Sequence, residues 1–96
     1  MKLKDLYSII QQRKKDLPKN SYTADLFRLG KDRIIQKFGE ESVEVLIAAK
    51  NGDKKSIIAE VADLQYHLLV LLVNLNINLK DIEKELQERY KKRNKT

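Results

Sequence analysis

The chain has one strong break between two long helical patterns, at Asn51-Gly52-Asp53. Asparagine and glycine are common where a helix ends, and aspartate is a preferred first residue of the next helix. Apolar residues recur at helical spacing over about residues 31–50 before the break and about residues 54–75 after it. We therefore expect these two segments to form an antiparallel helical hairpin.

Shorter helical patterns flank this hairpin. One runs from the N-terminus to about Lys15, and another begins at a predicted N-cap, Ser21, and ends near Leu29. A last helix follows Asn78 and is apolar on one face only. No alternating strand pattern is present, so the sequence predicts a single all-α domain of four to five helices over residues 1–96.

Residues 68–73 are apolar on every side of their predicted helix, whereas the neighbouring helices are apolar on one side. A helix of this kind has to be covered all round. The first and last helices and the helix before the break would cover part of it, and a second subunit that completes a four-helix bundle would cover more. We therefore expect a homodimer with a dimeric four-helix-bundle core.

Two acidic pairs lie at equal distances from Gly52. Glu41 and Glu44 precede it by 11 and 8 residues, and Glu60 and Asp63 follow it by 8 and 11 residues. Residues equidistant from the turn of an antiparallel hairpin lie opposite each other, so we expect the four carboxylates at one level. Like charges that converge on a packed surface repel one another unless a cation lies between them. Oxygen ligands without thiolates suit Mg²⁺ or Mn²⁺.

Other residues share the face of these carboxylates. Arg33 and Lys37 precede the acidic pairs on the same helix, where they are candidates for binding phosphate or for ordinary ion pairs. His67 lies one turn after Asp63, and a hydrogen-bonded histidine beside a site is more common than a direct metal ligand. Gly39 inside the helix indicates either close approach of another group or a tolerated kink.

The chain resembles a known family at these positions. Residues 37–44, KFGEESVE, and residues 60–72, EVADLQYHLLVLL, look like phosphoribosyl-ATP pyrophosphohydrolase, the histidine-biosynthesis branch of the MazG-like all-α NTP pyrophosphatases. Ser21-Tyr22-Thr23 and Leu26 also match the pattern of this branch. The resemblance extends over about residues 21–89.

The resemblance implies a reaction. Phosphoribosyl-ATP would be hydrolysed between its α and β phosphates to phosphoribosyl-AMP and pyrophosphate, the second step of histidine biosynthesis. By the family motif the two acidic pairs would hold Mg²⁺, with Glu40 beside them as a supporting carboxylate or the base. The expected site residues are Glu40, Glu41 and Glu44 for catalysis, Glu41, Glu44, Glu60 and Asp63 for the metal, and Arg33 and Lys37 for the substrate.

Two alternatives stay open. The acidic motif is shared by the whole superfamily, so the chain could instead be a housecleaning NTP pyrophosphatase that acts on a different (d)NTP. The net charge of +6 is concentrated in a basic tail from about residue 89, which contains Arg89, Lys91, Lys92, Arg93 and Lys95. Cations are favoured at the C-terminal end of a helix, and the usual interpretation is a solvated end. A non-enzymatic helical dimer that binds nucleic acid through this tail is the alternative from another class.

No segment indicates export or membrane anchoring. The N-terminus is charged and lacks the apolar region of a signal peptide. The longest charge-poor stretch, residues 64–79, contains His67 and three asparagines and is shorter than the roughly 20 apolar residues of a membrane span. The absence of cysteine fits a reducing compartment. We expect a soluble cytoplasmic protein.

Overall fold

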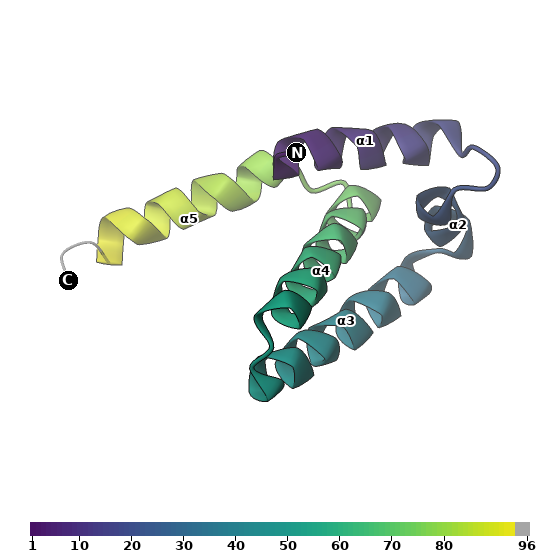
Figure 1. Ribbon diagram of the computed structural model, residues 1–96. Coiled ribbons are helices and arrows are strands. Elements are labelled where there is room, and N and C mark those ends of the chain that lie inside the picture. The colour runs from purple at the N-terminus through teal and green to yellow at the C-terminus, as the bar shows by residue number, and fades with distance from the viewer. Residues whose placement is uncertain (94–96) are drawn as a thin grey trace.

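The computed structural model describes residues 1–93, which form five α-helices and no strand (Figure 1). The helices are α1 (Leu3–Asp16), α2 (Tyr22–Leu29), α3 (Lys31–Asn51), α4 (Lys54–Asn74) and α5 (Leu79–Arg93). The prediction of an all-α fold with four to five helices is confirmed, and the predicted helix ends lie close to these bounds.

The turn between α3 and α4 is determined by the residues at the sequence break. Gly52 has a left-handed backbone, φ 78°, and its N–H donates to the Ala48 carbonyl oxygen at 3.0 Å. Asp53 caps α4, because its Oδ2 accepts hydrogen bonds from the Ser56 backbone N–H at 3.1 Å and the Ser56 hydroxyl at 2.6 Å. These bonds from Ser56 lower the pKa of Asp53. Since glycine adopts the left-handed conformation without a Cβ clash, α3 ends here and the chain reverses into α4.

The core lies where α1, α2 and the α3–α4 hairpin meet. Helix α3 packs most extensively on α4, while α1 packs on α4 and α2, and α2 packs on α3 (Figure 1). The largest fully buried side chains come from three helices: Ile10 of α1, Ile34 of α3, and Leu69 and Val70 of α4. This packing holds the two hairpin helices side by side, which the candidate site requires.

Helix α5 extends away from the other helices (Figure 1). Only its first residue, Leu79, packs against the core, and α5 contains no buried residue. The expectation that the last helix covers the apolar helix is therefore wrong within the described chain. Its apolar face, Ile82, Leu86 and Tyr90, is exposed, because the chain after Asn78 leads α5 outward instead of back along α4.

Helix α3 also carries an exposed apolar surface, which we call the α3 stripe. It consists of Ile35, Val43, Leu46 and Ile47, which are 45%, 52%, 68% and 51% exposed. Gly39 lies at helical spacing within this stripe. No other part of the described chain comes within 4 Å of the place where a Cβ of residue 39 would sit. The prediction that another group approaches Gly39 closely is therefore wrong within residues 1–93.

Helix α4 is the one described helix that is long and apolar enough, by length and composition, to cross a membrane. The sequence analysis considered only residues 64–79, which are too short for a membrane span, and so underestimated the apolar length of this helix. The central helix of a packed core meets the same criterion, and α4 is such a helix, since Leu69, Val70, Leu72 and Val73 are buried. This core packing accounts for the C-terminal half of α4, and 28% of its apolar window is buried within the described residues.

Candidate functional site

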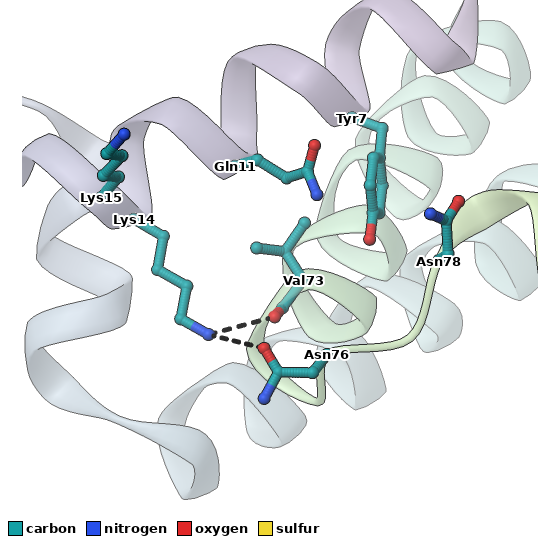
Figure 2. Close-up of a pocket in the computed structure, with 7 residues that line it drawn as sticks. All are labelled: Tyr7, Gln11, Lys14, Lys15, Val73, Asn76 and Asn78. Atoms are coloured by element: carbon teal, nitrogen blue, oxygen red, sulfur yellow. Dashed lines mark hydrogen bonds between the residues drawn. The ribbon is translucent and has the colours of Figure 1, made fainter.

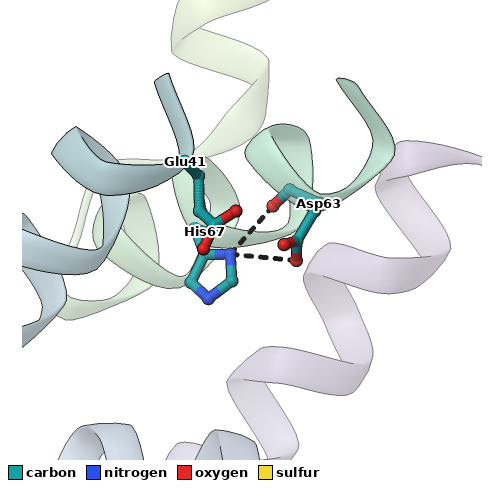
Figure 3. A group of neighbouring side chains, drawn as sticks. All are labelled: Glu41, Asp63 and His67. Carbon is teal, nitrogen blue, oxygen red and sulfur yellow. Dashed lines mark hydrogen bonds and ion pairs between the residues drawn. The ribbon is translucent and has the colours of Figure 1, made fainter. Parts of the chain in front are cut away.

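The α3–α4 hairpin brings three ionisable side chains together: Glu41 of α3 with Asp63 and His67 of α4 (Figure 3). One potential ligand atom from each of them lies within 4.8 Å of the others. Glu41 and His67 are buried, at 7% and 4% exposed, whereas the Asp63 side chain is 46% exposed. The cluster therefore has a buried floor and one side open to solvent.

Glu41 and Asp63 meet because the hairpin turns at Gly52, from which both are equally distant along the chain. The other two acidic residues lie one turn nearer to the hairpin turn, with Glu44 exposed and Glu60 partly buried. Their carboxylates do not belong to the cluster among residues 1–93. Without a cation, like charges separate and an exposed carboxylate turns toward water. The four-carboxylate metal site stays a prediction.

Lys37 is the cation nearest to the buried carboxylate. Its Nζ lies 3.3 Å from Glu41 Oε1 and 3.7 Å from Glu40 Oε1. Burial lowers the pKa of Lys37, but the hydrogen bond to Glu41 and the nearby Tyr22, Glu41 and Glu40 outweigh this effect and leave the pKa raised. Lys37 is therefore protonated at neutral pH and offsets the charge of Glu41. Phosphate binding by Lys37 stays a prediction beside this observed ion pair.

Glu40 and Arg33 lie on the exposed side of α3. The Glu40 Oε2 accepts a hydrogen bond from Gln36 Nε2 at 3.0 Å, and the Glu40 side chain is 49% exposed. Arg33 is exposed and has no carboxylate of residues 1–93 within ion-pair distance. Both side chains are thus accessible to a ligand that approaches α3 from solvent, and their predicted roles stay predictions.

Both ring nitrogens of His67 are hydrogen-bonded. Its Nδ1 lies 2.8 Å from the Asp63 backbone oxygen, and because a carbonyl oxygen only accepts, Nδ1 carries the hydrogen. Its Nε2 lies 3.1 Å from the Tyr22 hydroxyl. The position of His67 near the carboxylates would suit a ligand, but neither nitrogen offers a free lone pair in this arrangement. His67 supports the cluster, in line with the commoner interpretation of the sequence.

Tyr22 is the residue that the sequence analysis left without a role. The first residues of α2 dock against α4: Ser21 caps α2, Thr23 Oγ1 is hydrogen-bonded to the Tyr66 hydroxyl, and the Tyr22 ring meets the His67 ring edge-on at 6.0 Å. Tyr22 and His67 are 45 residues apart. No local pattern links them, and only the family resemblance at Ser21-Tyr22-Thr23 pointed to this segment.

A separate cavity of about 420 Å³ lies where α1 crosses the C-terminal end of α4 (Figure 2). Lys14 Nζ donates to the Val73 carbonyl oxygen at 3.2 Å and to Asn76 Oδ1 at 3.3 Å, so it satisfies the end of α4. The residues that line this cavity are Tyr7, Gln11, Lys14, Lys15, Val73, Asn76 and Asn78. Without a carboxylate, this lining is no part of the acidic cluster.

Part of the positive charge at the C-terminus is matched within α5 itself. Arg89 Nε lies 3.3 Å from Glu85 Oε1, and Lys91 Nζ lies 3.8 Å from Glu88 Oε1. Lys95, which belongs to the predicted basic tail, lies outside the described residues. This pattern agrees with a solvated helix end and adds no support for a nucleic-acid interface.

Comparisons with known proteins agree with one another. The family model described as phosphoribosyl-ATP pyrophosphohydrolase matches residues 3–90. A phosphoribosyl-ATP pyrophosphatase of Leptospira biflexa is 53% identical over 90 residues, which are 94% of this chain and 95% of that protein. One of Clostridium novyi is 48% identical over 90 residues, 94% of this chain and 82% of that protein. The histidine biosynthesis bifunctional protein HisIE of Caldanaerobacter subterraneus is 53% identical over 90 residues, 94% of this chain and 44% of that protein.

Proposed function

The chain belongs to the phosphoribosyl-ATP pyrophosphohydrolase family, and we propose that it hydrolyses phosphoribosyl-ATP to phosphoribosyl-AMP and pyrophosphate in histidine biosynthesis. The observation that carries this proposal onto the structure is the meeting of Glu41 and Asp63 across the α3–α4 hairpin. A pyrophosphohydrolase acts on a strongly anionic substrate. Its site therefore needs a cation between its own carboxylates and the phosphates.

The residues of the cluster fit a divalent cation. Glu41 is buried, and Lys37 is the only lysine or arginine of residues 1–93 within ion-pair distance of Glu41 or Asp63. Lys37 pairs with Glu41 and not with Asp63, so a further cation would offset the charge of Asp63. Mg²⁺ typically binds through a few carboxylates and keeps places for water and substrate phosphates. We assign Glu41 and Asp63 as its first ligands, with Glu44 and Glu60 joining when their side chains turn inward; Mn²⁺ fits the same oxygen donors.

Each of the remaining polar residues has a proposed task. When bound, the cation would offset the charge on the phosphates and lower the pKa of the attacking water. Glu40, exposed beside the cluster, accepts the proton of that water as general base. Lys37 holds Glu41 in place and, with Arg33, binds the outer phosphates, since residues four apart lie on the same face of α3.

A direct assay tests the reaction. With Mg²⁺ present, we expect pyrophosphate release from phosphoribosyl-ATP to exceed release from any member of a panel of NTPs and dNTPs. Glu44→Gln is expected to lower the rate by about 10-fold or more, because it removes a proposed ligand charge. Release from NTPs but not from phosphoribosyl-ATP would point to a housecleaning pyrophosphatase. No release from either, together with salt-sensitive binding of DNA or RNA, would point to the nucleic-acid alternative.

We also propose that the enzyme is a homodimer. Its radius of gyration, 15.2 Å, exceeds the approximately 12 Å of a compact domain of this length. The α3 stripe forms an apolar surface on the hairpin, and surfaces of this kind are commonly interaction sites. A second copy that packs on the same hairpin face would bury both stripes and complete a four-helix bundle. The support comes from the uncovered face and the open shape of the protomer.

Sedimentation equilibrium at micromolar concentration tests the dimer. We expect twice the chain mass of 11.2 kDa for the wild type. Leu46→Asp is expected to give a monomer, because it places a charge in the α3 stripe. Leu29→Asp is the matched control: Leu29 is 67% exposed against 68% for Leu46, but it ends α2 outside the stripe. A monomeric wild type, or equal effects of both changes, would contradict this interface.

We propose a soluble cytoplasmic enzyme. The C-terminal half of α4 packs in the domain core through Leu69, Val70, Leu72 and Val73, and the proposed substrate is a soluble nucleotide. Neither the proposed reaction nor the proposed dimer requires a membrane or a nucleic acid as a partner.

A further inference from the structure

A chain of hydrogen bonds links α2 to the acidic cluster. The Tyr22 hydroxyl lies 3.1 Å from His67 Nε2, and His67 Nδ1 lies 2.8 Å from the Asp63 backbone oxygen. The same Nδ1 lies 3.3 Å from the Asp63 carboxylate oxygen Oδ1 (Figure 3). One histidine ring therefore contacts Asp63 through both its backbone and its side chain, and its far edge is held by another helix.

The His67 ring is held in this orientation. It is 4% exposed and meets Tyr66 edge-on, with ring centroids 4.9 Å apart and planes at 86°. Because Nδ1–H donates to a carbonyl oxygen, Nε2 of the neutral ring accepts from the Tyr22 hydroxyl. Rotation of the ring would break both bonds. The Nδ1–H group is thereby aimed at Asp63.

Asp63 depends on this contact. Its side chain is 46% exposed, and among residues 1–93 no other side chain lies within hydrogen-bond or ion-pair distance of its carboxylate. An exposed aspartate without a partner samples several rotamers. The 3.3 Å contact between His67 Nδ1 and Asp63 Oδ1 restricts these rotamers and leaves the other carboxylate oxygen for a cation. Groups that hold a metal-binding carboxylate or histidine in this way commonly change metal affinity 10- to 100-fold.

We propose that His67 and Tyr22 are positioning residues that hold Asp63 ready for a divalent cation, an inference that rests on the metal site of the proposed function. Tyr22 orients His67, and His67 orients Asp63. Neither residue touches the cation or the phosphates. This assigns a task to the N-terminal end of α2, which the acidic motif by itself does not include.

Two substitutions of His67 separate its two hydrogen bonds. The amide nitrogen of asparagine occupies nearly the place of Nδ1, so His67→Asn keeps the donor to Asp63. The amide of glutamine reaches the place of Nε2. His67→Gln therefore keeps the hydrogen bond to Tyr22 and loses the donor to Asp63. Using Mn²⁺ as the probe and the full chain without substrate, we expect His67→Gln to weaken binding by about 10-fold or more and His67→Asn by less than about 3-fold. Tyr22→Phe is expected to fall between them.

A second readout distinguishes positioning from general damage to the fold. In pyrophosphate release, His67→Gln is expected to raise the half-saturating Mg²⁺ concentration, while saturating Mg²⁺ restores most of the rate. Thr23→Val is the structural control, because it removes the Tyr66 partner on α2 and leaves the Tyr22–His67–Asp63 chain intact. It is expected to bind Mn²⁺ like the wild type.

Wild-type Mn²⁺ affinity in His67→Gln would overturn the inference. So would equal weakening by His67→Asn, His67→Gln and Thr23→Val, because the effect would then follow from loosened packing. If the wild type binds Mn²⁺ and His67→Gln weakens that binding, but no pyrophosphate is released from phosphoribosyl-ATP, the positioning role stands and the proposed reaction fails.

Discussion

Glu41→Gln and Asp63→Asn are each expected to lower pyrophosphate release from phosphoribosyl-ATP by at least about 100-fold, since loss of a ligand should cost no less than loss of a supporting group. Each change keeps the shape of the side chain and removes one negative charge from the cluster. The charge would otherwise bind the cation that offsets the phosphates as the anhydride bond breaks. Initial rates with Mg²⁺ and Mn²⁺ binding without substrate measure the two effects separately.

Glu83→Gln is the matched control for this pair. Glu83 is an exposed glutamate of α5, and no lysine or arginine of residues 1–93 forms an ion pair with it. We expect its rate to stay within about 2-fold of the wild type, since a surface charge far from the cluster affects the phosphates weakly through water. Full activity in Glu41→Gln, or turnover that survives EDTA, would contradict the metal site.

Leu69→Ala is expected to lower the free energy of unfolding by about 2–5 kcal/mol. Leu69 is 2% exposed and lies in the core cluster where α1, α2 and the hairpin helices meet. Truncation leaves a cavity among side chains that cannot fully close around it. Because the net stability of a domain is only about 5–15 kcal/mol, this single change should remove a large part of the free energy of unfolding. Urea unfolding followed by circular dichroism at one fixed protein concentration measures it.

Leu86→Ala provides the comparison for Leu69→Ala. Leu86 is 61% exposed on α5, and we expect its truncation to change the free energy of unfolding by no more than about 0.5 kcal/mol. A cost as large as that of Leu69→Ala would mean that α5 packs against an apolar surface in solution. That result would contradict the open position of α5 in the protomer. It would also favour α5 over the α3 stripe as the dimer interface.

The helices and the hairpin could be predicted from the sequence because their signals are local. A left-handed Gly52 and a capping Asp53 act within one turn of the chain, and the helical spacing of apolar residues identifies the face that each helix buries. The opposition of Glu41 and Asp63 follows from the same local facts, since a tight turn determines which residues of two antiparallel helices lie at the same level.

The environment of Glu41 and Asp63 depended on the tertiary structure. Sequence spacing placed Glu44 and Glu60 at the same level as the other two carboxylates, but side chains without a cation separate according to their charge and exposure, and these two lie outside the cluster. Helix α5 shows a similar limit. Its one-sided apolar pattern identifies the face that is suited to packing, but it does not identify the helix or subunit that packs there.

By itself the sequence therefore determined an all-α fold of four to five helices, their approximate ends, the hairpin, and the opposition of Glu41 and Asp63 across it. Only the tertiary structure decided that Tyr22 reaches His67 and that α5 leaves the core. The physical reason is range. Caps and periodicity depend on residues within one or two turns, whereas a contact across 45 residues depends on how α2 and the hairpin pack together in three dimensions.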